Sequence, residues 1–290
     1  MIKYFNLIGA TWKIGQITLL TNIDKNLLCI DRLSIKGKDM RLPSLDHQTT
    51  NFGFQKVPME SKSGLVRDVF NSVSPKYDLM NDLMSFGIHR LWKTALLDWL
   101  TPHPKKILLD VAGGTGDIAN RYVTRGGGPV FVCDINQTML NVGKKKLEQN
   151  SNNDKIQWIC GDAEALPIPE RSIDVYTIAF GLRNVTSITN ALSEAQRVLR
   201  PGGRFMCLEF SKPAVSLLNP LYDAYSFKIL PEIGHLVAND RNAYKYLAES
   251  IRQFPNQSKL MGQIENAGLE KASYRNLSGG IACIHSAWRI

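Results

Sequence analysis

Short apolar runs alternate with amphipathic stretches along most of this chain. The apolar runs have the length of buried strands and occupy residues 107–111, 130–133, 156–160, 175–179 and 205–208. Between them, apolar residues recur at helical spacing, which predicts helices over residues 118–124, 138–147 and 188–199. Strands that alternate with helices are typical of βαβ units, so the pattern predicts an α/β fold with a largely parallel sheet.

The chain before the first of these strands has a mainly helical pattern. Residues 63–70, 77–83 and 90–100 carry apolar side chains at helical spacing, and no internal repeat is visible. We therefore expect residues 51–290 to form one domain in which an N-terminal helical cap precedes the sheet.

The first 50 residues do not share this pattern. Residues 4–23 contain one charged side chain, Lys13, but Asn, Gln, Thr and Gly interrupt their apolar character, so no membrane span is expected. A basic segment followed by a clean apolar core is missing, which argues against a secretory signal. We expect residues 1–50 to be an extension that is disordered, dispensable or upstream of the true start. A mitochondrial transit peptide is the alternative, although the segment is poor in Arg and Ser.

The composition is that of an ordinary globular protein with a basic balance. The 290 residues are 44% hydrophobic and carry a formal net charge of +9, which favours an anionic partner such as nucleic acid or a membrane surface. The charge is diffuse, since residues 1–50 hold seven basic and four acidic side chains. The densest run, Lys144 to Lys146, fits one solvated helical face. No basic stretch is interleaved with aromatic residues, so nucleic acid is not the expected partner.

The cysteines and histidines show no ligand spacing. Five cysteines stand far apart without a CxxC pair, which argues against a disulfide framework and against zinc. We expect no metal site, and a reducing compartment.

A glycine-rich loop follows the first predicted strand. It contains Gly113, Thr115 and Gly116, and acids stand on either side of it at Asp110 and Asp117. Glycines let the backbone turn sharply and approach a ligand, and the next helix offers free N–H groups. The loop lacks the G-x-G-x-x-G spacing of dinucleotide folds, and carboxylates beside it would repel a pyrophosphate. It favours a cationic ligand with an ammonium and a sulfonium, although a purely structural turn is the alternative.

Two further acids end the next strands. Asp134 is placed to accept hydrogen bonds from two ribose hydroxyls, and a helix N-cap is its other interpretation. Asp162 is placed to accept from an adenine amino group, while the backbone N–H of Ala163 donates to the ring; a turn residue is the alternative for Asp162. Because the carboxyl ends of parallel strands meet at one edge, these groups predict a nucleoside site there.

This set of residues resembles the class I S-adenosylmethionine (SAM)-dependent methyltransferases. Within that class, the chain from about residue 52 to 290 is similar to the ubiquinone/menaquinone biosynthesis C-methyltransferase family. The motifs that carry this similarity are residues 77–82, 87–93, 180–185, 208–213, 249–255 and 278–281. The resemblance implies a Rossmann-like, mostly parallel seven-stranded sheet with helices on both faces.

The resemblance also implies a reaction and its cofactor. SAM would lie against Gly113, Thr115, Gly116, Asp134, Asp162 and Ala163, with no metal. The acceptor would be a polyprenylated quinol, either 2-methoxy-6-polyprenyl-1,4-benzoquinol or demethylmenaquinol. Ala179 departs from the Ser of some members, which puts a side-chain contact there in doubt.

Methyl transfer to a ring carbon needs an adjacent hydroxyl to lose its proton, and the pKa of a phenol lies near ~10. We expect Arg183 to stabilise the phenolate or to act through a water, and Asn184 to fix the orientation of the ring. A free arginine is a poor base, and a structural ion pair is the alternative for Arg183. Tyr77 and Asp82 are expected to close the cap over the site.

Residues 215–236 are rich in Leu, Tyr, Phe and Ile and are expected to form a lid for the prenyl tail or the bilayer, with ordinary helix packing as the alternative. We expect a bacterial protein in the cytoplasm, peripheral at the inner membrane; the matrix side of the mitochondrial inner membrane is the alternative. A homodimer and other quinone-biosynthesis enzymes are further partners left open. The rival classes are a nicotinamide dehydrogenase, a nucleic-acid methyltransferase and a non-catalytic scaffold.

Overall fold

The computed structural model describes residues 48–73, 81, 82, 85, 87–148, 153–212, 232 and 241–290. The expected extension lies outside these residues except for its last three positions. Tyr77 also lies outside them, and so does the expected lid apart from Glu232.

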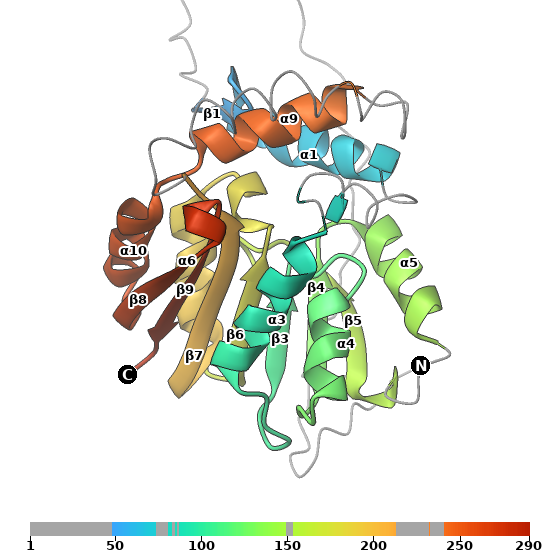
Figure 1. Ribbon diagram of the computed structural model, residues 1–290, viewed down its shortest axis with the longest axis vertical. Helices are drawn as coiled ribbons and strands as arrows, with labels where there is room; N and C mark the ends of the chain where they lie inside the picture. Colours follow the sequence, from blue (N-terminus) through green and yellow to red (C-terminus); the bar gives the residue numbers. More distant parts are fainter. Residues whose placement is uncertain are drawn as a thin grey trace, which may run out of the picture. The chain divides into compact units, whose positions relative to one another are not determined.

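A seven-stranded sheet forms the centre of the described chain (Figure 1). Its strands, in spatial order, are β5 (Ile156–Cys160), β4 (Val130–Asp134), β3 (Leu108–Val111), β6 (Ile173–Ala179), β7 (Leu199–Phe210), β9 (Ala282–Trp288) and β8 (Glu270–Leu277). The first five strands pair in parallel, whereas β9 pairs antiparallel with both β7 and β8. The predicted mostly parallel, Rossmann-like sheet is therefore confirmed.

Most of the predicted strands are largely buried, but β5 is only partly buried, and the buried strand β9 was not predicted. All four residues of β3 are buried, so the strand reads as a continuous apolar run apart from Asp110. The chain order reverses at β3, because β4 and β5 lie on one side of it and β6 and β7 on the other. Ligands of open α/β sheets bind at the carboxyl ends of strands at such a point.

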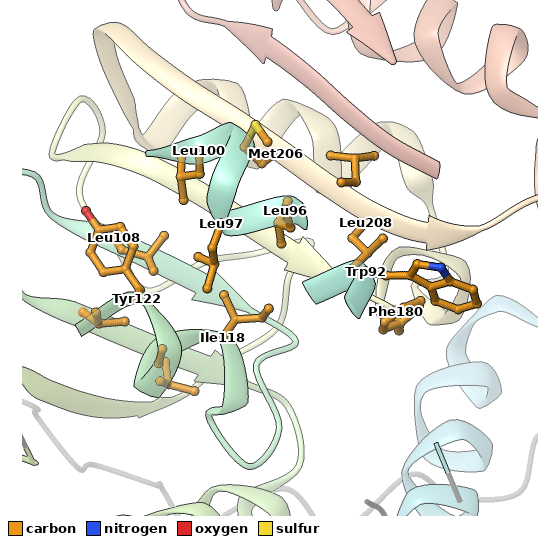
Figure 2. Close-up of a cluster of buried hydrophobic side chains, with 14 of the residues drawn as sticks. Trp92, Leu96, Leu97, Leu100, Leu108, Ile118, Tyr122, Phe180, Met206 and Leu208 are labelled. Carbon is orange, nitrogen blue, oxygen red and sulfur yellow. The ribbon is translucent and has the colours of Figure 1, made fainter. Parts of the chain in front are cut away.

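Helices cover both faces of this sheet (Figure 1). They are α3 (His89–Leu100), α4 (Asp117–Thr124), α5 (Gln137–Leu147), α6 (Ile188–Val198) and α10 (Gln257–Asn266). A further helix, α9 (Arg241–Gln253), lies across the ends of the strands instead (Figure 1). On one face, Leu96 and Leu97 of α3 pack with Tyr122 of α4 against Met206 and Leu208 of β7 (Figure 2). On the other face, α6 and α10 bury apolar side chains against the sheet.

The predicted helix over residues 188–199 ends one residue earlier than expected. Leu199 already pairs with Ile173, so β7 begins before the Pro-Gly-Gly turn and its register shifts across that turn. Gly202, with φ at +77°, makes the reversal without strain.

The N-terminal part of the described chain forms a hairpin and a long helix. Strands β1 (Thr49–Phe52) and β2 (Gln55–Pro58) pair antiparallel, and α1 (Met59–Val73) follows. Phe52 stacks on Tyr246 of α9 with a centroid distance of 4.4 Å. Figure 1 shows α1 beside α9, across the carboxyl ends of the strands. The hairpin was not predicted, whereas the helix expected over 63–70 lies inside α1.

None of the helices in the described ranges is long and apolar enough to cross a membrane.

Candidate cofactor and active site

The loop between β3 and α4 is held in a conformation that glycine favours. Gly114 and Gly116 have φ values of +54° and +76°, and Ala112 also lies at a positive φ of +49°. A Cβ on Gly113 would lie 2.7 Å from Cγ1 of Val132. The loop therefore needs glycine at 113 for space and at 116 for its backbone conformation.

Replacing Gly116 with alanine should lower the free energy of unfolding by about 1–3 kcal/mol, because the new Cβ would combine a positive φ with strain against its neighbour. That Cβ would lie 2.6 Å from Cη2 of Trp158. The matched control is Gly262→Ala, since Gly262 lies within α10 and a Cβ there meets nothing within 4 Å. The control should stabilise the protein by about 0.5–1 kcal/mol. Urea unfolding measures both, and equal midpoints for the two variants would contradict this account.

Asp134 connects the glycine-rich loop to the loop after β4. Its Oδ2 accepts a hydrogen bond from the N–H of Gly114 at 2.8 Å, and its Oδ1 accepts from the N–H of Asn136 at 2.8 Å. Burial raises the pKa of Asp134, and these two backbone donors oppose that rise. The N-cap interpretation is wrong for this residue, because the side chain of Asn136 caps α5. The carboxylate of Asp134 is therefore held at the edge of the sheet.

In the loop after β5, Asp162 is a turn residue. The Oδ1 of Asp162 accepts from the N–H of Glu164 at 2.9 Å, and its backbone carbonyl accepts from Ala165. Each carboxylate oxygen has further lone pairs, so this turn leaves acceptor capacity for a ligand.

A cavity joins these loops at the carboxyl ends of the strands. Its empty volume is about 790 Å³, including space open to solvent. Of the residues expected at the site, the structure brings together Asp134, Asp162, Ala163 and Asn184 as lining. Gly113, Thr115 and Gly116 lie in the adjoining loop, of which Ala112 and Gly114 line the cavity.

One side of this first cavity comes from α1. Ser63, Val66, Arg67 and Phe70 line it, and none of them was expected at the site. The helical pattern of residues 63–70 was visible, but no local motif shows which distant loop such a helix covers. Together with Ile135 and Met139, these side chains give the cavity an apolar part beside its carboxylates. An adenosine moiety has matching parts, namely a flat apolar ring and ribose hydroxyls, so the residues present fit the expected cofactor.

Two of the four acids expected around a cationic ligand do not line this cavity, which corrects that expectation. Asp117 pairs with Nζ of Lys93 at 2.8 Å and with Nε of Arg121 at 2.8 Å. Burial alone would raise the pKa of Asp117, but Lys93 and Arg121 outweigh it and lower the pKa to about 2. Asp117 therefore ties α3 to the start of α4.

Asp110 lies in β3 and is buried. Its Oδ1 accepts from Oγ1 of Thr177 at 2.8 Å, and its Oδ2 has no hydrogen-bond partner among the described residues. Burial raises the pKa of Asp110 to about 7, because Thr177 and Lys93 compensate only part of the desolvation. Near neutral pH this carboxyl is therefore partly protonated.

Asp110→Asn should remove a pH dependence of stability between about pH 4 and pH 7. An acid whose pKa is higher in the folded state than its ordinary 3.8 binds its proton more tightly when folded. Its contribution is fully present below pH 4 and is lost as the pH rises through 7, by up to about 1.4 kcal/mol per pH unit. Denaturant unfolding from pH 5 to 8 should show the native protein losing stability relative to the variant. Parallel curves would contradict the raised pKa.

Arg183 lies in a buried ion pair. Its Nη1 contacts Oε1 of Glu209 at 2.7 Å, and the two side chains are 4% and 1% exposed. The same Nη1 donates to the carbonyl of Phe180 at 2.5 Å, and the guanidinium lies 5.5 Å from the ring centroid of Phe210. Burial raises the pKa of Glu209, and the charge of Arg183 opposes this. Arg183 therefore forms the structural ion pair given as its alternative role. It does not line the first cavity.

Asn184 lies at the end of η3 (Leu182–Asn184) and lines the first cavity. Its Oδ1 accepts a hydrogen bond from the hydroxyl of Tyr246 at 3.1 Å. Tyr246 thereby holds the amide of Asn184 in one orientation.

The segment after Asn184 is fixed from three sides. Nζ of Lys62 donates to the carbonyl of Val185 at 2.7 Å, and Oγ1 of Thr50 donates to the carbonyl of Thr186 at 3.2 Å. The carboxylate of Glu164 accepts from the N–H groups of Thr186 and Ser187. The hairpin and α1 therefore position the loop that follows β6.

Asp82, expected in the cap, pairs with neighbours on α3. It contacts Nε2 of His89 at 2.8 Å and Nη2 of Arg90 at 2.7 Å. The hydrogen bond from Arg90 is the main cause that lowers the pKa of Asp82 to about 2. In the described ranges, no group of three His, Cys, Asp or Glu residues could hold a metal ion.

Known proteins match most of this chain. The ubiE/COQ5 methyltransferase family matches residues 56–289. A ubiquinone/menaquinone biosynthesis C-methyltransferase UbiE from Paracoccus denitrificans is 54% identical over 83% of this chain and 97% of its own length. The protein of the same name from Acidiphilium cryptum is 54% identical over 84% of this chain and 98% of its own length.

Among solved structures, a SAM-dependent methyltransferase from Thermotoga maritima has a TM-score of 0.55. It is 17% identical over 77% of this chain and 99% of its own, which shows the shared fold alone. The sequence matches go further than the fold: the chain belongs to the ubiE/COQ5 methyltransferase family.

Proposed function

We propose that this protein transfers the methyl group of SAM to a ring carbon of a polyprenylated quinol in ubiquinone or menaquinone biosynthesis. The observation that carries the proposal is the first cavity, where Asp134, Asp162 and Ala163 meet Asn184 at the carboxyl ends of four neighbouring strands. The names of the UbiE relatives support the same reaction.

The cofactor would be held by groups at three strand ends. The carboxylate of Asp134 would accept from the ribose hydroxyls, and Asp162 and the N–H of Ala163 would bind the edge of the adenine. The loop of Gly113, Thr115 and Gly116 provides close backbone approach beside them. When bound, SAM supplies an electrophilic methyl group, so the chain itself must activate the acceptor carbon.

Activation means stabilising a phenolate whose parent hydroxyl has a pKa near ~10. Arg183 precedes the lining residue Asn184 in η3, and its charge would favour the ionised form of a hydroxyl held near Asn184, although Arg183 itself does not line the first cavity. Because an arginine paired with Glu209 is a poor base, the proton leaves through water rather than to Arg183 itself. Asn184, held by Tyr246, orients the ring.

Lipid-quinone profiling tests the proposed function. Cells that lack this protein should accumulate the unmethylated precursor, and the native gene should restore the methylated quinone. An Asp134→Ala gene, which lacks the proposed ribose acceptor, should restore it poorly. An unchanged quinone profile after loss of the protein would overturn the proposal.

We also propose peripheral contact with the inner membrane of a bacterium, on its cytoplasmic side; the matrix side of a mitochondrion is the alternative. A prenylated acceptor resides in the bilayer, and the net charge of +9 favours an anionic surface. Flotation with vesicles of anionic or neutral lipids tests this contact, and equal recovery with both would contradict the electrostatic part. A homodimer and complexes with other quinone-biosynthesis enzymes stay predictions, which light scattering and co-purification test.

We place the boundary of the catalytic domain near residue 50, as the pattern predicts. The UbiE relatives and the matched family support it, since the family match begins at residue 56. A chain starting at Asn51 would lose Thr50 and its bond to the loop after β6, so the truncation should begin at Asp46. It should keep the unfolding midpoint of the full chain, measured by circular dichroism. A midpoint lower by several degrees would show that the extension stabilises the domain.

A further inference from the structure

A second cavity lies on the other side of the loop that follows β6. Val185 and Thr186 line both cavities, and the second one has an empty volume of about 710 Å³, including space open to solvent. Its other lining residues come from the hairpin, α1, η3, α6, α9, α10 and the link between α9 and α10. It therefore lies where N-terminal and C-terminal elements meet the loop that follows β6.

Two buried cations line this second cavity, and no carboxylate does so among the described residues. Lys62 is 5% exposed and Arg183 is 8% exposed. Cations are almost never fully buried without anionic partners. Such a lining raises the local potential and favours a ligand that carries negative charge.

The carboxylates near these cations are already engaged by other groups. Glu209 pairs with Arg183 and also accepts from the N–H of Phe210, and Glu164 accepts from two backbone N–H groups. Neither lines the second cavity. Burial lowers the pKa of Lys62, and the charge of Glu164 opposes this only in part. A bound anion would therefore stabilise the charged form of Lys62, whose burial Glu164 compensates only in part.

Two residues that line this cavity also carry unsatisfied polar atoms. Nε of Arg183 and Oε1 of Gln263 are buried without hydrogen-bond partners among the described residues. The ammonium of Lys62 has three N–H groups, and the carbonyl of Val185 accepts one of them. The amide of Gln263 can turn to present its N–H groups instead of its oxygen. Residues of α1, η3 and α10 with unused hydrogen-bonding capacity thus line one cavity.

We propose that the second cavity is a binding site for an anionic oxygen group, held by Lys62 and Arg183. Two sources share this chemistry: a free oxyanion such as phosphate, and an ionised oxygen of the methyl acceptor. In both cases the ligand touches the same loop, at Val185 and Thr186, that lines the first cavity.

Inorganic phosphate is the probe for the test. Thermal unfolding of the full chain is followed against phosphate concentration, with sodium chloride keeping the ionic strength constant. Phosphate also stabilises proteins by exclusion from their surface, but that effect is common to all variants. The informative quantity is therefore the difference in phosphate Kd between matched variants.

Thr189 offers a matched pair of variants that should fold. It is an exposed residue in the first turn of α6 and lines the second cavity, so an acid there suits the helix dipole. Thr189→Glu should raise the phosphate Kd about tenfold, because it adds a negative charge at the rim, whereas Thr189→Gln should stay within about twofold. Lys62→Gln should weaken binding at least as much as Thr189→Glu. Its control is Lys259→Gln, an exposed lysine on α10 outside the cavity.

Equal phosphate affinities in the native protein, Thr189→Glu and Thr189→Gln would overturn the proposal, even if Lys62→Gln does not fold. A kinetic arm, which rests on the proposed function, then separates the two sources. If phosphate competes with the quinol, the cavity binds an ionised oxygen of the acceptor. If phosphate does not compete, the cavity binds a separate oxyanion. The phosphate-binding measurement does not depend on enzymatic activity. Its result can therefore be interpreted even if the proposed function is wrong.

Discussion

Glu209→Gln lowers the free energy of unfolding by about 3–5 kcal/mol, the usual cost of leaving one member of a buried ion pair without its partner. The guanidinium of Arg183 would keep its charge with 4% of its side chain exposed and without its carboxylate. Denaturant unfolding measures the loss at pH 7.

The double variant Arg183→Met with Glu209→Gln separates stability from catalysis. Removing both charges also removes the unpaired ion, so at least half of the lost stability should return. Methyl transfer should stay abolished, because the proposed cation is absent. A double variant as unstable as Glu209→Gln would show that the pair is not the cause. An active double variant would remove Arg183 from the proposed mechanism.

Asp134→Ala raises the Kd for SAM about 100-fold, since hydrogen bonds to a charged acceptor contribute about 1.5–3 kcal/mol. The substitution removes the expected ribose acceptor. It also frees the N–H groups of Gly114 and Asn136, which the carboxylate now holds. The glycine-rich loop would lose part of its support, so the two effects act in the same direction.

Calorimetry with SAM measures this change, and Asp154→Ala is the control. Asp154 is an exposed acid in η2 (Asn153–Lys155), at the other end of β5 from Asp162. The control should bind SAM as the native protein does. A folded Asp134→Ala protein whose Kd for SAM changes less than twofold would contradict the assignment of the first cavity.

Local signals explain what could be predicted from the sequence. Buried parallel strands such as β3 are continuous apolar runs, and the loops after them carry Gly113, Asp134 and Asp162. Because parallel strands end at one edge, three local motifs predict one shared site, and the structure brings Asp134 and Asp162 together in one cavity. The hairpin of β1 and β2 lacks such a signal, because its Phe52 packs on Tyr246, almost 200 positions along the chain.

Charge pairing was harder to predict, because it depends on neighbours that only the fold brings together. Asp117 stands beside the glycine-rich loop in sequence, yet it pairs with Lys93 of α3. Arg183 was expected at the reaction centre, and its partner Glu209 comes from the next strand. Nothing in the spacing of these residues distinguishes a structural ion pair from a ligand contact. The lining from α1 escaped prediction for the same reason.

The most direct test is methyl transfer by the purified full chain from SAM with an isotopically labelled methyl group. The acceptors are 2-methoxy-6-polyprenyl-1,4-benzoquinol and demethylmenaquinol, kept reduced in vesicles. We expect label on a ring carbon of at least one acceptor, located by mass spectrometry and NMR, and far less with Asp134→Ala. Label on a phenolic oxygen, or SAM binding without label on either ring, would contradict it.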